Sequence, residues 1–193
     1  MKKLTALALT LMVASLATAQ LPPRGKASAA VGGKVVTIDF GQAKLGARTL
    51  DELMKGLPAD GVWRAGRDQV TTLSTEGPIT IGGKTVPAGK YSLYVPVAKD
   101  GTYSLAVNKH LGVALKTIFA AAPPAVANEP WPIMSDYDKQ IGKDEVARVV
   151  LTGGKNAAPV DPFAITLTPK GTGATLTLAW GDRSFSTEIA AGK

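Results

Sequence analysis

The residues best suited to bind or transform a ligand lie in one short segment, Trp63-Arg64-Ala65-Gly66-Arg67-Asp68. The planar guanidinium of Arg64 can donate a fork of hydrogen bonds to a carboxylate or phosphate, and the indole of Trp63 can form a stacking wall beside it. This pattern predicts a ligand site. A competing interpretation is a buried tryptophan beside an arginine paired with an internal acid such as Asp68, because arginine is rarely buried unless paired. The residues support both interpretations equally.

Composition excludes several kinds of catalytic chemistry. The chain has no cysteine and a single histidine, His110, so a disulfide, a thiol nucleophile and a zinc site built from cysteines or histidines are all excluded. A Ser-His-Asp relay would need His110, yet the sequence holds no Gly-x-Ser-x-Gly nucleophile elbow. No glycine-rich phosphate loop leads from a strand into a helix. We therefore predict no catalytic residue, no metal and no cofactor.

One acidic run could hold calcium. Its oxygen-bearing side chains are Asp136, Asp138, Gln140 and Asp144. The run departs from the EF-hand pattern, because its glycine stands one position late, at Gly142, and Ala147 occupies the position of the bidentate glutamate. Neighbouring lysines would repel a cation, so a solvated loop is the preferred interpretation. Weak calcium binding by residues 136–144 stays open.

Alternation of apolar and polar residues indicates strands along most of the chain. In Val36-Thr37-Ile38-Asp39-Phe40 every second residue is apolar, which gives a strand one buried and one solvent-facing side. The same alternation recurs in residues 91–95, 103–107, 163–168 and 175–180. Turn residues separate the runs, among them the hairpin signal Asp100-Gly101, Gly153-Gly154 and Gly181-Asp182. Many short strands at close spacing predict an all-β fold, an antiparallel β-sandwich of the Greek-key type.

Two local features refine this fold. Only Leu50–Leu57 has a helical pattern, for about two turns, with Thr49 as its N-cap. Tyr91 opens a strong strand. A tyrosine at such a place in a Greek-key sandwich often bonds back to nearby backbone, so we expect Tyr91 to pin a corner of the chain instead of contacting a ligand.

One stretch breaks the rhythm of strands and turns. Residues 120–140 contain four prolines and no alternation. A connection this long inside a compact domain is either a functional loop or a flexible insertion. Trp131 is its largest side chain, and we expect it to dock this long proline-rich loop onto the sandwich.

The beginning of the chain predicts export. A positive start, an apolar run and small residues before Gln20 form the pattern of a secretory signal peptide over residues 1–19. Residues 20–193 are then expected to form a single β-sandwich domain in the periplasm or outside the cell, with no transmembrane segment. Cleavage of the predicted signal peptide would remove Lys2 and Lys3 and leave 20 of the 22 basic residues against 15 acidic ones. This small, dispersed surplus predicts no nucleic-acid partner and leaves attraction to an anionic envelope surface open.

Residues 61–93 resemble the core pattern of the exported bacterial proteins grouped as domain of unknown function family 2911. The matching residues are Trp63-Arg64, Gly66, Thr71-Thr72 and the Gly-Lys-x-x-Pro-Ala-Gly-x-Tyr-Ser-Leu run of residues 83–93. Where the family pattern has Asn-Glu, this chain has Asp68-Gln69. The resemblance implies an exported, β-sandwich-like domain and implies no activity.

The leading function hypothesis is a non-catalytic binding or envelope-associated module whose partner is a small molecule or an envelope component. Its ligand-binding candidates are Trp63, Arg64, Asp68, Asn108, Lys109 and Arg148. The first alternative is a hydrolase-type enzyme, which requires all of these residues except the tryptophan to converge on one reacting atom. The second alternative is a purely structural envelope protein, in which the same residues scatter over the surface. The oligomeric state is not predicted.

Overall fold

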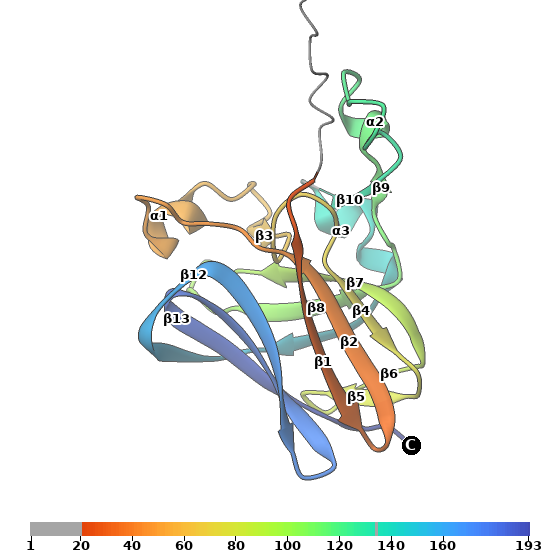
Figure 1. Cartoon of the computed structure of the whole chain (residues 1–193). Coiled ribbons are helices and arrows are strands. Elements are labelled where there is room, and N and C mark those ends of the chain that lie inside the picture. The colour runs from red at the N-terminus through yellow and green to blue at the C-terminus, as the bar shows by residue number, and fades with distance from the viewer. Residues whose placement is uncertain (1–20, 134) are drawn as a thin grey trace, which may run out of the picture.

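The computed structural model describes residues 21–133 and 135–193, so the predicted signal peptide over residues 1–19 lies outside the described part of the chain. The described residues form antiparallel strands in two main sheets that pack against each other (Figure 1). This architecture confirms the predicted all-β, sandwich-like fold, while the Greek-key connection stays a prediction. None of the described helices is long and apolar enough to cross a membrane.

The larger sheet contains β1 (Arg24–Val31), β2 (Lys34–Gly41), β3 (Val62–Trp63), β4 (Thr72–Thr75), β7 (Gly89–Pro96), β8 (Ser104–Asn108) and β11 (Glu145–Val150). Its hydrogen-bonded order is β1-β2-β4-β7-β8-β11, and β3 pairs with β7. β7 and β8 form the predicted hairpin around Asp100-Gly101. The Asp100 carboxylate accepts a hydrogen bond from the Thr102 N–H at 2.9 Å, which stabilises the turn.

The smaller sheet contains β12 (Thr152–Lys170), β13 (Gly173–Ala191), β5 (Ile79–Ile81) and β6 (Lys84–Val86), in that order. β12 and β13 form a long hairpin that packs on β1 (Figure 1). The predicted turns at Gly153-Gly154 and Gly181-Asp182 are wrong, because both pairs lie inside these strands. Gly181 has a φ of +58° beside a register shift between Val160 and Ala164. This glycine therefore marks a bulge instead of a chain reversal.

The main core fills the space between the two sheets. Val36, Ile38 and Phe40 of β2 belong to it and are at most 3% exposed, as the alternation predicted. Leu176 and Leu178 of β13 close it from the other sheet and are buried as completely. Complete burial of one such side chain contributes about 1.5–3 kcal/mol to stability. The sandwich thus depends on apolar residues at alternate positions of facing strands.

Strands β7 and β8 are buried on both faces, and the prediction of one solvent-facing side is wrong for them. Tyr94 of β7 and Ala106 of β8 are fully buried but lie outside the main core. They pack instead against Ile133, Tyr137 and Ile141. These three residues come from the proline-rich connection and the turn that follows it, so this part of the chain covers the second face of the sheet.

The proline-rich connection has local structure of its own. The elements in and around it are β9 (Val113–Ala114), α2 (Leu115–Ile118), β10 (Pro130–Trp131), α3 (Tyr137–Gln140) and the 3-10 helix η1 (Gly142–Asp144). β10 pairs with β9, which places Trp131 opposite Val113. The Tyr94 hydroxyl accepts a hydrogen bond from the Ile133 N–H at 3.0 Å. Trp131 is only partly buried, so Ile133 and Tyr137 anchor the connection more than the expected tryptophan does.

Two local predictions are confirmed. Helix α1 spans Leu50–Lys55, and Thr49 caps it through a capping box in which Thr49 Oγ1 accepts from the Glu52 N–H and the Glu52 carboxylate accepts from the Thr49 N–H. The Tyr91 hydroxyl donates to the Pro87 carbonyl at 3.0 Å, which pins the corner where β7 begins.

We expect Tyr91→Phe to lower the free energy of unfolding by about 1 kcal/mol, because it removes the hydrogen bond to Pro87 and keeps the packed ring. Chemical denaturation measures the change. The slope of the free energy of unfolding against denaturant concentration should stay the same as in the parent chain. A variant as stable as the parent chain would show that Tyr91 contributes packing alone.

Candidate functional site

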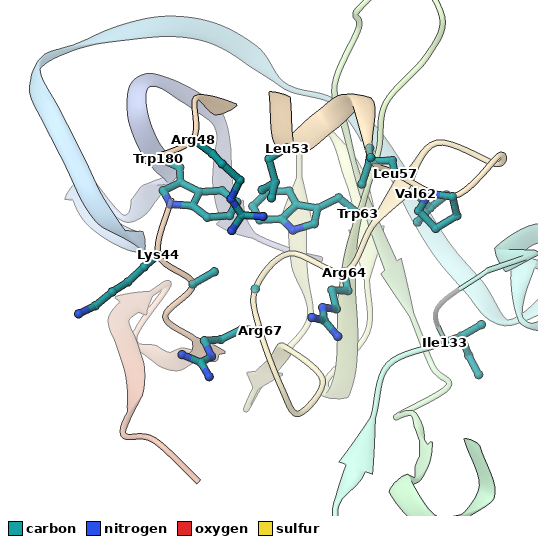
Figure 2. A pocket seen from close by; sticks show the side chains of 14 residues that line it. Lys44, Arg48, Leu53, Leu57, Val62, Trp63, Arg64, Arg67, Ile133 and Trp180 are labelled. Atoms are coloured by element: carbon teal, nitrogen blue, oxygen red, sulfur yellow. The ribbon is translucent and has the colours of Figure 1, made fainter. Parts of the chain in front are cut away.

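A pocket of about 460 Å³ opens beside α1 and β3, at one end of the sandwich (Figure 2). Five segments line it: the connector between β2 and α1, α1 with the turn after it, β3 with the loop that follows, the proline-rich connection, and β13. Its apolar lining includes Leu53, Leu57, Val62 and Ile133. Segments far apart in the chain therefore build the pocket together.

Two tryptophan rings form one wall of the pocket. The indoles of Trp63 on β3 and Trp180 on β13 are stacked, with ring centroids 5.4 Å apart and 18° between their planes. Phe163 of β12 meets Trp63 edge-on at 4.9 Å and lies 5.6 Å from Trp180. Aromatic pairs in such geometries contribute about 0.5–1.5 kcal/mol beyond the area they bury. Since the rings come from both sheets, this wall is fixed where the sheets meet.

Trp180 also carries an unsatisfied hydrogen-bond donor. The residue is 3% exposed, and its Nε1 is buried without a hydrogen-bond partner among the described residues. A buried N–H that bonds to nothing costs about 1–3 kcal/mol. Native proteins retain few such groups, and the reasons for those that remain include strain, a catalytic role and a bound water or ion.

The connector that carries Lys44 is bonded to β12 on both sides of that residue. The Phe163 N–H donates to the Ala43 carbonyl at 2.7 Å, and the Leu45 N–H donates to the Asp161 carboxylate at 3.0 Å. These bonds hold the backbone of Lys44 at the pocket. Its side chain stays exposed at the rim.

All four charged residues that line the pocket are cationic: Lys44, Arg48, Arg64 and Arg67. No acidic residue belongs to the lining, as far as the structure describes the chain. Lys44 and Arg48 are exposed, whereas Arg64 and Arg67 are partly buried. Arg67 Nε donates to the Asp68 carboxylate at 2.7 Å, so Asp68 offsets part of this charge from outside the lining. A positive potential thus faces an apolar, aromatic wall.

Arg64 differs from the rim cations in its hydration. Burial lowers the pKa of its guanidinium, while the charge of Asp68 raises that pKa and the charge of Arg67 lowers it. Arginine nevertheless stays protonated in proteins, so the shift describes a cation that has lost part of its hydration. Coulomb attraction grows as the effective dielectric falls. Arg64 therefore gains more from an anionic partner than an exposed arginine would.

The loop after β3, which carries these two arginines, has an unusual backbone. Ala65 and Asp68 have positive φ angles of 51° and 58°, a region that residues other than glycine rarely occupy. The Ala65 carbonyl accepts a hydrogen bond from Thr71 Oγ1 at 2.8 Å. A Cβ on Gly41 would collide with the Arg67 carbonyl, so glycine is required there. Backbone strain held in place by its surroundings is characteristic of ligand sites.

Arg24 of β1 holds the far end of the same loop. Its guanidinium pairs with Asp39 and donates to the carbonyls of Gln69 at 3.2 Å and Val70 at 3.0 Å. Gln69, which stands where the family pattern has glutamate, donates through Nε2 to the Glu129 carboxylate at 2.9 Å. An ionised glutamate could not donate this bond. The loop is thereby tied to the larger sheet and to the proline-rich connection.

Asn108 and Arg148 belong to a different cluster, around α3. The buried Asn108 amide donates to the Tyr137 hydroxyl at 2.9 Å and to the Ile141 carbonyl at 2.8 Å. The Tyr137 hydroxyl donates to Glu145, which in turn pairs with Arg148 at 2.7 Å. The pKa of Tyr137 is raised, mainly by burial. Its hydroxyl is therefore protonated and a donor at neutral pH. This network fastens α3 onto the sheet.

The sequence candidates therefore separate. Trp63 and Arg64 line the pocket, whereas Asp68, Asn108, Lys109 and Arg148 do not. Lys109 is exposed, and its backbone N–H donates to the Asp144 carbonyl at 2.9 Å. The hydrolase alternative thus has one of its five residues, Arg64, in the pocket lining.

The acidic run is engaged by cations. Asp136 pairs with Lys139 at 3.4 Å, and Asp138 pairs with Arg148 at 3.2 Å. Within the described ranges, no group of three or more His, Cys, Asp or Glu side chains is placed to hold a metal.

Several pocket residues were not identified from the sequence, namely Lys44, Arg48, Ile133 and Trp180. Trp180 ends an alternating run of residues. That pattern predicts that Trp180 is buried, but it does not predict that Trp180 stacks on Trp63. Lys44 and Arg48 stand in a polar connector with no pattern. Arg67 was part of the Trp63–Asp68 segment but was not singled out. Only the packing of the two sheets brings these residues together.

Comparison with known proteins gives a match to a protein family. The model of a family described as a protein of unknown function, DUF2911, matches residues 22–189. This span confirms the resemblance found in the sequence and includes every pocket residue named above. No curated protein and no solved structure matches the chain.

We expect Asn108→Ala to lower the free energy of unfolding by about 2–4 kcal/mol, because it leaves the buried Tyr137 hydroxyl and Ile141 carbonyl short of a partner. Lys109→Ala is the matched control at the exposed neighbour and should change this free energy by less than about 0.5 kcal/mol. Urea denaturation of both variants makes the comparison. Equal stabilities would contradict a structural role for the Asn108 network.

Proposed function

Because the chain belongs to the DUF2911 family, whose description assigns no function, we propose a function from the pocket itself. The protein is a non-catalytic binding module for a small organic anion that has an apolar, ring-bearing body. One observation carries the proposal: the charged residues of the pocket lining are all cationic, and they face the stacked Trp63 and Trp180.

The size of the pocket supports a small-molecule ligand. Its volume of about 460 Å³ falls within the range of about 300–1,000 Å³ that is usual for small-molecule sites. Such sites combine a mostly apolar lining with a few polar groups that orient the ligand. Here Leu53, Leu57 and Val62 supply apolar surface, and the arginines supply the orienting groups.

The charges of the pocket define the ligand head. A guanidinium binds carboxylate or phosphate through two parallel hydrogen bonds, which gives direction as well as attraction. Arg64 and Arg67 come from one loop, and Arg48 and Lys44 line the same pocket (Figure 2). An anion placed among these side chains would be attracted by several positive charges at once.

The aromatic wall defines the ligand body. The face of an indole favours an offset-stacked or edge-on ring. The stacked Trp63 and Trp180 of the pocket wall therefore support a flat ring on the ligand. We therefore expect an aromatic or alicyclic carboxylate or phosphate.

The placement of the hydrolase candidates favours binding over catalysis. Catalytic groups must reach one reacting atom. Asn108 is engaged in the network around α3, and Arg148 is paired with Glu145 and Asp138. These contacts fasten structural elements outside the pocket lining.

We expect Arg64→Gln to weaken binding of an aromatic carboxylate by about 30-fold, the equivalent of about 2 kcal/mol for a charge-assisted hydrogen bond. The measurement is a thermal-shift and calorimetry panel of ring-bearing carboxylates, each paired with its neutral amide. Lys155→Gln, which removes one exposed charge away from the pocket, is the control and should bind like the parent chain.

A ligand that stabilises the native state raises the melting temperature. If no anion of the panel does so, or if amides bind as well as acids, the proposed function is wrong. If Lys155→Gln weakened binding as much as Arg64→Gln, the effect would come from the net charge of the protein and not from the position of Arg64 in the pocket.

We also propose that the protein is exported, on the strength of the signal-peptide pattern in residues 1–19. Expression in a bacterial host should give a mature chain that begins at Gln20 and is found in the periplasmic fraction. Intact-mass measurement checks the cleavage. A cytoplasmic protein that retains Met1 or begins at Lys2 would contradict export.

A further inference from the structure

Most of the exposed large apolar side chains of the described residues lie in one short segment of the chain. Five such residues are Val35, Leu111, Ile118, Phe119 and Val150. Three of them belong to residues 111–119, around α2. Single exposed apolar residues are ordinary, but a cluster of them indicates an interaction surface.

This apolar tip, defined as residues 116–125, projects beyond the sheets in Figure 1. Ile118 is 47% exposed and Phe119 is 52% exposed, and the alanines at 120 and 121 next to them are exposed as well. A protruding aromatic and a branched aliphatic side chain present apolar surface that a flat partner can cover.

The tip is a hydrogen-bonded structure with a buried base. Leu115 and Val126 are at most 9% exposed and pack its two ends inward. The Lys116 N–H donates to the Ala127 carbonyl at 2.9 Å, and the Phe119 N–H donates to the Leu115 carbonyl at 2.9 Å. The buried Leu115 and Val126 and these backbone bonds fix the two ends of the tip, and Ile118 and Phe119 lie exposed between them.

The segment that carries the tip contains lysines but no acidic residues. Residues 109–128 contain Lys109 and Lys116 and no aspartate or glutamate. The first acid after them, Glu129, accepts a hydrogen bond from Gln69 at the base. Both lysines are exposed. Exposed apolar side chains that share a segment with lysines and no acids fit a surface that is anionic outside and apolar just beneath, which is the interface of an anionic bilayer.

We propose that the apolar tip docks the protein onto an anionic phospholipid surface, with Ile118 and Phe119 entering the interface and Lys109 and Lys116 contacting the headgroups. Helix α1 and strand β3, which line the pocket, lie toward the same end of the molecule as the tip (Figure 1). Docking would therefore bring the pocket close to the membrane. The proposal does not depend on the identity of the pocket ligand.

The test is co-sedimentation of the exported, purified chain with phospholipid vesicles, with its N-terminus read by mass spectrometry so that residues 1–19 do not contribute. Vesicles contain either phosphatidylcholine alone or about 30% phosphatidylglycerol, which gives the surface its negative charge. We expect binding to the anionic vesicles, weaker binding as salt is raised, and little binding to the neutral vesicles.

Matched variants locate the contact. Ile118→Ser with Phe119→Ser should lower the partition constant at least about tenfold by removing apolar surface. Lys109→Gln with Lys116→Gln should lower it about 30-fold, since each lysine contributes about fivefold near an anionic surface. Val150→Ser changes an apolar residue on β11 that is even more exposed and should bind like the parent chain. Circular dichroism confirms that each variant is folded.

Three results would overturn the proposal: no binding of the parent chain to anionic vesicles, equal binding to neutral vesicles, or unchanged binding of the serine pair. A fourth is a dimer in light scattering that the serine pair converts to monomer, because a second copy of the chain would then cover the tip. Binding of the aromatic carboxylate by the serine pair should be unchanged, so the outcome is separate from that of the pocket proposal.

Discussion

The contact of Trp63 with Trp180 and Phe163 joins the two sheets at the end of the sandwich that carries the pocket. β3 is only two residues long, so its pairing with β7 contributes few hydrogen bonds of its own. The stacked and edge-on rings hold this short strand against β12 and β13. The loop with Arg64 begins at the next residue, and its position follows from that of the tryptophan.

The pocket reduces the stability that the core supplies. It keeps partly buried arginines, two non-glycine residues at positive φ and an unsatisfied indole N–H in one place. Each of these features opposes folding by itself, by about 1–3 kcal/mol for the strained or orphaned groups. A large apolar core between the sheets offsets them, which is the usual relation between a rigid scaffold and a binding site.

The proline-rich connection and the residues just before it have different physical roles. The later part of the connection covers the second face of β7 and β8 with Ile133 and Tyr137, so the sheet centre becomes fully buried. The residues before it leave Ile118 and Phe119 exposed. The short pairing of β9 with β10 lies between the exposed residues and the covering part. This stretch of chain thereby completes the fold and presents a surface.

The sequence by itself determined the strands, the Asp100-Gly101 hairpin, the capped helix α1 and the Tyr91 corner, because these depend on interactions between residues close in the chain. It also determined the family, and it singled out Trp63 and Arg64, which line the pocket. Tertiary structure alone decided that Gly153-Gly154 continues a strand, that the outer face of β7 is covered, and that Trp180 stacks on Trp63. It also separated Asn108 and Arg148 from the pocket. Local pattern specifies which face of a strand is apolar, but the partner of that face depends on how distant segments pack.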